Sequence, residues 1–147
     1  MKCALDTSKT LALISHIHSC AEEYLCTELK KKGLPELSTS HGFILYNLSV
    51  FEKLTMGEIA TKINRDKSTA TVLVKKLINL NLVETKSCTK DSRVKYVSLS
   101  EKGKQFTDAT AEISANLLKK CYKGFSSKDA ENLTSYLLCV ANNFDSE

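Results

Sequence analysis

Residues 54–103 constrain the fold most strongly, because they predict two short capped helices followed by a pair of strands. Thr55 and, three residues later, Glu58 have the spacing of a capping box, in which each side chain bonds the backbone of the other. Asp66 is a favourable N-cap for a second helix that should run to about Leu80. Two short helices joined by a tight turn predict a helix-turn-helix.

The second of these helices has one apolar face and one polar face. The residues expected to pack inward are Ala70, Leu73, Val74, Leu77 and Ile78. The residues expected to face outward are Lys67, Ser68, Thr71, Val72, Lys75 and Lys76, with Thr69 near the first turn. Small hydroxyl residues at a helix start fit a DNA groove, and Val72 is suited to contact a thymine methyl. An ordinary solvated amphipathic helix would show the same pattern, so this helix alone does not decide the function.

A basic hairpin is expected to follow the second helix. The segments 82–86 and 94–99 are short and rich in β-forming residues, and the polar segment SCTKDSR joins them. The cationic residues of the hairpin are Lys86, Lys90, Arg93 and Lys95. Such a hairpin beside a groove-sized helix can follow phosphates or enter the minor groove. The expected fold is therefore mainly α with a small β-hairpin wing, a winged helix-turn-helix.

These segments resemble the MarR family of bacterial transcriptional regulators at four places. The matching segments are Asp66-Lys67-Ser68-Thr69-Ala70-Thr71, Asn81-Leu82-Val83, Asp91-Ser92-Arg93 and Leu99-Ser100-Glu101-Lys102-Gly103. The resemblance implies a set of DNA-binding residues: Lys67, Ser68, Thr69, Thr71, Val72, Lys75, Lys90, Asp91 and Arg93. Val72 stands where the family often has arginine, and the wing has few arginines, so we expect binding to depend on lysine–phosphate contacts.

Long helices are expected on both sides of this segment. We interpret residues 1–147 as one MarR-like domain, with a DNA-binding lobe at 35–103 and a helical dimerisation lobe at 7–32 and 104–145. The terminal helices carry apolar surfaces wider than one core contact needs, and the resemblance implies that they pair with a second copy. Packing within a single chain is the alternative. A homodimer would read a near-palindromic site on double-stranded DNA.

The resemblance also implies a repressor that is released by a small molecule, with the effector in a cleft between the two lobes. The candidate effector residues are His16, Cys20, Tyr24, His41 and Tyr46, whose imidazole and phenol groups suit a phenolic or carboxylate ligand. Six cysteines without a CxxC pair are expected to be mostly free thiols, and no metal or cofactor is expected. Cys88, beside the lysines of the wing, and Cys20 are candidate redox residues, so a thiol-responsive regulator is an alternative function.

Composition excludes several other classes. A 42% hydrophobic content excludes disorder as the default, and the net charge of +4 is compatible with nucleic acid without requiring it. The sequence lacks a signal-peptide core and an apolar run long enough for a membrane span, so we expect a cytoplasmic protein. No P-loop, GxGxxG, HExxH or GxSxG motif is present, so an enzyme is not expected. A winged-helix module that binds a protein partner stays open as an alternative to DNA binding.

Overall fold

The computed structural model describes residues 6–145, which form two compact units. The N-terminal unit reaches to Ile113, and the C-terminal unit begins at Ser114, inside the fifth α-helix. The elements in chain order are a 3-10 helix at Thr7–Lys9, then α1 (Thr10–Lys31), α2 (Thr39–Phe51), β1 (Lys53–Thr55), α3 (Met56–Lys62), α4 (Lys67–Asn79), β2 (Val83–Ser87), β3 (Lys95–Leu99), α5 (Glu101–Cys121) and α6 (Ser127–Asp145). The prediction of a mainly α protein with a small β wing is confirmed.

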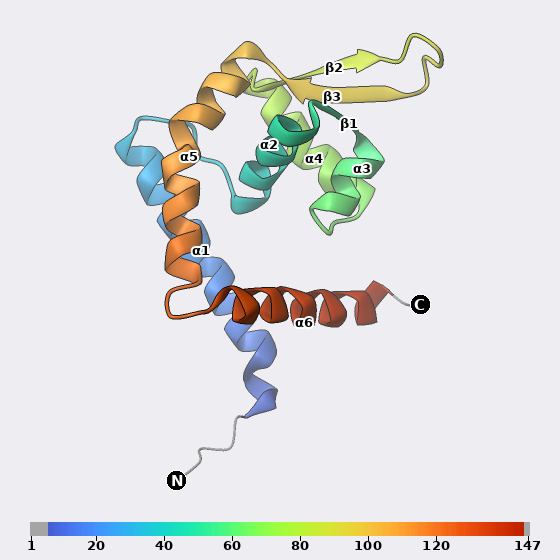
Figure 1. The fold of residues 1–147 in the computed structure, drawn as a ribbon. Helices are drawn as coiled ribbons and strands as arrows, with labels where there is room; N and C mark the ends of the chain where they lie inside the picture. The colour runs from blue at the N-terminus through green and yellow to red at the C-terminus, as the bar shows by residue number, and fades with distance from the viewer. Residues whose placement is uncertain (1–5, 146–147) are drawn as a thin grey trace. The chain divides into compact units, whose positions relative to one another are not determined.

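A three-stranded antiparallel sheet forms the wing, with the strand order β1-β3-β2. The hairpin of β2 and β3 projects from the helices α2, α3 and α4 (Figure 1). The sequence predicted only this hairpin and missed β1, which pairs Leu54 with Val97 of β3. Leu54 is buried in this strand, so it anchors the sheet in addition to preceding the α3 cap.

The core of the N-terminal unit lies where α2, α3 and α4 meet the sheet. Its residues with 2% exposure or less are Leu29, Ile44, Leu45, Leu48, Ile59, Ala70, Val74, Leu77, Leu82 and Val97. Three of the five residues expected to face inward on α4 are fully buried, and Leu73 packs against the core as a partly buried residue. The prediction for Ile78 is wrong, because its side chain is 38% exposed. Ile78 lies at the edge of the apolar face and is the penultimate residue of α4.

Capping interactions fix the starts of α3, α4 and α6. The capping box of Thr55 and Glu58 on α3 and the Asp66 cap on α4 are both confirmed. Ser126 caps α6, because its hydroxyl oxygen accepts the Asp129 N–H at 3.1 Å. These caps satisfy backbone N–H groups that have no partner inside the helix, so each fixes where its helix begins.

A short turn ties α4 to the start of α5. Asn81 adopts a φ of 58°, a left-handed conformation that asparagine tolerates. The next residue, Leu82, is fully buried, and its carbonyl oxygen accepts the Ser100 N–H at 3.0 Å. The Ser100 hydroxyl donates to the Asn81 carbonyl at 2.6 Å, and Lys102 donates to the Leu80 carbonyl at 3.0 Å. Consecutive carbonyls of one turn therefore hold the first turn of α5.

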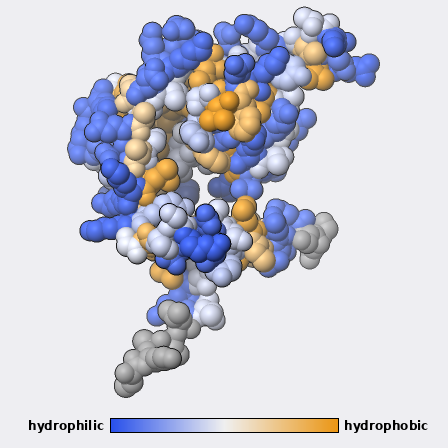
Figure 2. All heavy atoms as spheres, in the orientation of Figure 1, coloured by the Kyte–Doolittle hydropathy of each residue, from blue (hydrophilic) through white to orange (hydrophobic). Residues whose placement is uncertain are grey.

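Apolar side chains remain exposed on several helices. Those of α1 are Leu11, Leu13, Ile14 and Ile17, and those of the C-terminal unit are Leu118, Phe125, Tyr136, Leu137, Leu138 and Phe144. No residue of α6 is buried. In Figure 2 a further apolar patch shows over α2, which exposes Phe43, Val50 and Phe51. A 19-residue helix with an apolar stripe and no buried side chain is a surface suited to a partner.

The long helices α1, α5 and α6 carry cysteines, which were expected to be mostly free thiols. Cys20, Cys121 and Cys139 are exposed free thiols, so none of them belongs to the core. Cys3 lies outside the described residues.

Candidate nucleic-acid interface

The outward face of α4 is exposed. Lys67, Ser68, Thr71, Val72 and Lys75 are all exposed, as predicted, and Thr69 is half-buried. Val72 is 69% exposed, which is high for an apolar side chain on a helix whose opposite face is fully buried. A helix that projects small polar and apolar groups in this way fits the width of a DNA major groove.

Asp66 organises the beginning of α4 through both of its carboxylate oxygens. Oδ1 accepts the Thr69 N–H at 2.8 Å and the Ser68 hydroxyl, and Oδ2 accepts the Thr69 hydroxyl at 2.7 Å. The Ser68 hydroxyl is the largest cause that holds the pKa of Asp66 far below its ordinary value, followed by the N–H and hydroxyl of Thr69. The carboxylate therefore stays ionised and its charge is neutralised locally by donors rather than by a cation.

The wing tip is shaped by its own backbone and by Asp91. The Asp91 carboxylate accepts the Arg93 N–H at 3.0 Å, and the Asp91 carbonyl accepts the Val94 N–H at 3.0 Å. The Cys88 N–H then closes the loop on the Val94 carbonyl at 2.8 Å. Asp91 therefore forms an Asx turn that presents the exposed Arg93 side chain, which is a positioning role that the motif alone did not reveal.

Cationic side chains on α4 and the wing are left without acidic partners. Within residues 6–145, Lys67, Lys75, Lys90 and Arg93 take part in no ion pair. Lys86 differs, because it pairs with Glu84 at 3.1 Å on the same strand. Unpaired cations beside an exposed helix form a surface suited to phosphate groups.

Cys88 lies half-buried at the base of the wing tip. Backbone N–H groups lower the pKa of its thiol, that of Asp91 most and that of Lys90 next, with a smaller contribution from the charge of Lys53. From the sequence we expected neighbouring lysine charges to favour the thiolate of Cys88. Backbone N–H groups are the larger cause of its lowered pKa.

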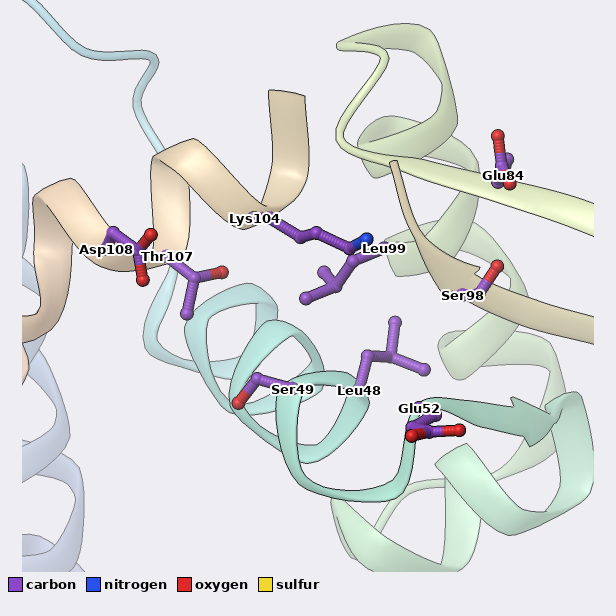
Figure 3. Close-up of a pocket in the computed structure, with 9 residues that line it drawn as sticks. All are labelled: Leu48, Ser49, Glu52, Glu84, Ser98, Leu99, Lys104, Thr107 and Asp108. Carbon is purple, nitrogen blue, oxygen red and sulfur yellow. The ribbon is translucent and has the colours of Figure 1, made fainter. Parts of the chain in front are cut away.

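A surface cavity of about 520 Å³ lies in the N-terminal unit between α2, the sheet and α5 (Figure 3). It is lined by Leu48, Ser49, Glu52, Glu84, Ser98, Leu99, Lys104, Thr107 and Asp108. Three carboxylates and one ammonium group face it, so its charge opposes an anionic ligand. None of the five predicted effector residues lines it. A cavity assembled from three separate elements leaves no periodic signal in the sequence.

The predicted effector residues have different surroundings. His16 and Cys20 are exposed on α1, with 3.7 Å between the Cys20 Sγ and the His16 Nε2. Tyr24 is half-buried on the same helix, and Tyr46 is exposed on α2, where its ring stacks on Phe43. Among residues 6–145, no three His, Cys, Asp or Glu side chains are grouped so as to hold a metal ion.

His41 is the most constrained of the five. It is 6% exposed, and its Nδ1 accepts the Ser38 N–H at 3.1 Å, which completes a capping box on α2. Its Nε2 is buried and has no hydrogen-bond partner in the described structure. Glu22 of α1 accepts the Thr39 N–H at 2.9 Å beside it. Sequence reasoning placed His41 in a first helical turn but missed its capping role, because histidine replaces the usual Glu or Gln.

Known proteins share this architecture. The model of the MarR family matches residues 37–95. A curated relative, the HTH-type transcriptional repressor IacR of Pseudomonas putida, is 26% identical over 102 residues, which are 69% of this chain and 61% of that protein. The S. aureus MepR–DNA complex has a TM-score of 0.74 at 19% identity and covers 95% of this chain and 98% of that one.

Bordetella bronchiseptica BpsR, whose DNA binding is regulated by 6-hydroxynicotinic acid, also has a TM-score of 0.74, at 11% identity over 90% of this chain and 92% of that one. At these identities the solved structures establish the shared fold. The fold and its exposed, capped helix define the class of winged helix-turn-helix proteins. The matches at 37–95 and over 102 residues make the chain similar to the MarR family and to a transcriptional repressor.

Proposed function

We propose that this chain is a homodimeric, sequence-specific DNA-binding repressor. The proposal rests on the exposed face of α4. This face begins with polar side chains, carries the unpaired Lys67 and Lys75, and belongs to the same compact unit as the cationic wing tip. In this reading α4 enters the major groove, and Lys90 and Arg93 contact phosphates or the minor groove. IacR is a repressor and MepR is seen bound to DNA, which supports the same role here.

Salt dependence tests the DNA contacts. Fragments would be selected from random DNA, and the dissociation constant of the best fragment would be measured by fluorescence anisotropy over a range of salt concentrations. Each lost phosphate contact is expected to reduce the salt slope by about 1, so Lys75→Ala and Arg93→Ala should each flatten it. Lys128→Ala is the matched control, because Lys128 is an exposed lysine on α6 that pairs with Glu131.

Two results would count against DNA binding. One is the absence of any complex with DNA at low salt, together with a salt-insensitive complex with a protein partner. That pair of results would favour the alternative, a winged-helix module that recognises a protein. The other is a salt slope for Lys75→Ala and Arg93→Ala equal to that of the parent, which would show that these residues do not contact phosphates.

The homodimer is supported by the exposed apolar residues of the terminal helices. Leu13 of α1 is 55% exposed, and Tyr136 of α6 is 67% exposed. Two copies that bury these surfaces would place two recognition helices about 34 Å apart, one DNA turn, facing a near-palindromic site. Light scattering should report a dimer for the parent and for Val50→Asp, a matched exposed position on α2, but a monomer for Leu13→Asp. A dimer that persists in Leu13→Asp and Tyr136→Asp would contradict this arrangement.

Release by a small phenolic or carboxylate molecule is the remaining part of the proposal. The DNA binding of BpsR is regulated by 6-hydroxynicotinic acid, an aromatic carboxylic acid. The candidate residues His16, Cys20, Tyr24, His41 and Tyr46 offer imidazole, thiol and phenol groups. Phenol and benzoate would be added to the DNA complex as probes. Release by either probe that is abolished by His16→Ala would support the site, and release that His16→Ala and Tyr46→Phe leave unchanged would place the effector elsewhere.

A further inference from the structure

Three hydroxyl side chains lie in the first two turns of α4, on Ser68, Thr69 and Thr71. A hydroxyl group offers one hydrogen-bond donor and two lone pairs, so it reads DNA differently depending on whether its proton is available. The partners that these hydroxyls already have therefore decide which base edges they can recognise.

All three protons are used inside the protein. The hydroxyls of Ser68 and Thr69 donate to the two oxygens of the Asp66 carboxylate. The Thr71 hydroxyl donates to the Lys67 carbonyl at 2.7 Å. An ionised carboxylate and a carbonyl oxygen accept only, so the hydroxyl has to be the donor in each pair.

Turning these protons toward DNA would be costly at the start of the helix. Asp66 would lose the two hydroxyl donors that, together with the Thr69 N–H, neutralise its carboxylate. The lone pairs of the hydroxyls stay free in the arrangement that the structure shows. The polar start of α4 is thus a surface of acceptors, bounded by the donor groups of Lys67 and Lys75.

Acceptors distinguish bases in the major groove. Adenine N6 and cytosine N4 carry donors there, whereas guanine presents N7 and O6 and thymine presents O4, all acceptors. Phosphate oxygens are acceptors as well. The hydroxyls of α4 therefore complement adenine or cytosine and have no proton to give to guanine or to the backbone.

Val72 favours adenine over cytosine as the base that the hydroxyls contact. Its side chain is apolar, 69% exposed and directly beside Thr71 on the outward face. Thymine is the base with a methyl group in the major groove, and it is paired with adenine, the base that presents the N6 donor. One A·T pair thus offers both a methyl group for Val72 and a donor for Thr71.

We infer that the centre of each half-site is an A·T pair, read by Thr71 as an acceptor for adenine N6 and by Val72 as a contact for the thymine methyl. This assignment of specificity rests on the proposed function, in which α4 enters the major groove. Lys67 and Lys75 lie outside this pair of residues, so guanine is compatible with the flanking positions.

The thymine contact is tested by removing one methyl group from the DNA. Each thymine of the selected fragment would be replaced in turn by deoxyuridine, which lacks only the 5-methyl group. At one position per half-site we expect the dissociation constant of the parent protein to rise about three- to tenfold, in keeping with the loss of one buried methyl. Val72→Ala should weaken binding to the unmodified fragment by a similar factor and show no further loss at that deoxyuridine.

The adenine contact is tested by removing the N6 amine. Replacement of the paired adenine by the unsubstituted purine deoxynucleoside should weaken binding of the parent protein. The same replacement should leave Thr71→Val unaffected, because valine has the shape of threonine but no lone pairs. Thr71→Ser keeps the hydroxyl and should retain the sensitivity of the parent, which separates recognition from a fault in folding.

The outcomes separate this inference from the proposed function. If a specific fragment is bound but no deoxyuridine substitution weakens it, or if sensitivity to deoxyuridine is the same in Val72→Ala, the inference is wrong and DNA binding stands. Selected half-sites with G·C at the centre would also overturn it. If no DNA is bound at low salt, the proposed function itself fails.

Discussion

Gly103, on the first turn of α5, is the glycine whose replacement should disturb this fold most. A Cβ atom at this position would lie 1.9 Å from the Leu82 carbonyl oxygen and 3.3 Å from the Leu99 side chain. Ordinary contacts between such atoms are about 3.5 Å, so the methyl group of alanine would be roughly 1.6 Å too close to the backbone oxygen. Because Leu82 is fully buried in the turn after α4, the strain cannot be relieved by turning a side chain.

The cost follows from the contacts that have to move. Overpacking of this kind costs about 1 to 3 kcal/mol. Separating α5 from the turn also weakens the bond from the Ser100 N–H to the Leu82 carbonyl, which contributes about 1 kcal/mol. Alanine recovers up to about 1 kcal/mol through its helix propensity. We therefore expect Gly103→Ala to lower the free energy of unfolding by about 1 to 3 kcal/mol, a large part of the stability of a small domain.

Urea unfolding monitored by circular dichroism measures this effect. With an m value of about 1.5 kcal/mol/M, the midpoint of Gly103→Ala should fall by about 1 to 2 M. Gly42→Ala is the matched control, because Gly42 lies inside α2 with no atom within 4 Å of its added Cβ. Gly42→Ala should raise stability by up to about 1 kcal/mol. A Gly103→Ala midpoint equal to or above that of the parent would refute the proposed clash.

Three further predictions concern ionisable groups. Burial, and then the charge of Lys76, lowers the pKa of His41 from its ordinary value of 6.5, while Glu22 opposes the shift. Between the folded and unfolded pKa values of His41, the unfolded chain therefore binds more protons than the folded chain. The free energy of unfolding should fall as pH drops below about 6.5, by at most about 1.4 kcal/mol per pH unit, and the fall should end at the lower pKa of the folded state. Urea midpoints between pH 5 and 7.5 should show this slope in the parent and lose it in His41→Gln, which keeps a capping-box residue without titrating. Asp66→Ala should destabilise the fold by about 1 kcal/mol in the same assay, and an unchanged midpoint would contradict its capping role. Cys88→Ser should remove the fastest-alkylated thiol from a mass-spectrometric time course with iodoacetamide at pH 7, and an unchanged fastest phase would remove support for a redox role of Cys88.

Local sequence signals predicted the parts of the fold that are decided locally. The starts of α3 and α4 follow from Thr55, Glu58 and Asp66, because a cap depends on residues three positions apart. The exposed face of α4 follows from helical periodicity in the same way. The left-handed turn at Asn81 was likewise readable, since asparagine tolerates positive φ.

Features that depend on distant residues were missed. Strand β1 has only three residues and is stabilised by pairing with β3, more than 40 positions later in the chain. Three residues are too few to show the alternating pattern that predicts a strand. The orphaned Nε2 of His41 depends on packing within the folded unit, which composition does not encode. The hydrogen bonds of the α4 hydroxyls are local, yet their direction became readable only when the rotamers of Ser68, Thr69 and Thr71 were known.

The turn at residues 80–82 supports both parts of the proposed DNA-binding surface, α4 and the wing. It ends the recognition helix, begins the wing through β2, and holds Ser100 and Lys102 at the start of α5. A displacement of the first turn of α5 would therefore carry α4 and the wing together, because the hydrogen bonds to three consecutive carbonyls resist separation. In the proposed dimer, such a displacement would change the spacing of two recognition helices on DNA while leaving the acceptors of each helix intact. Affinity for the whole site and preference for the central base pair should therefore vary independently. Gly103→Ala should raise the dissociation constant for the selected fragment, while the fold increase caused by deoxyuridine substitution should stay the same as in the parent.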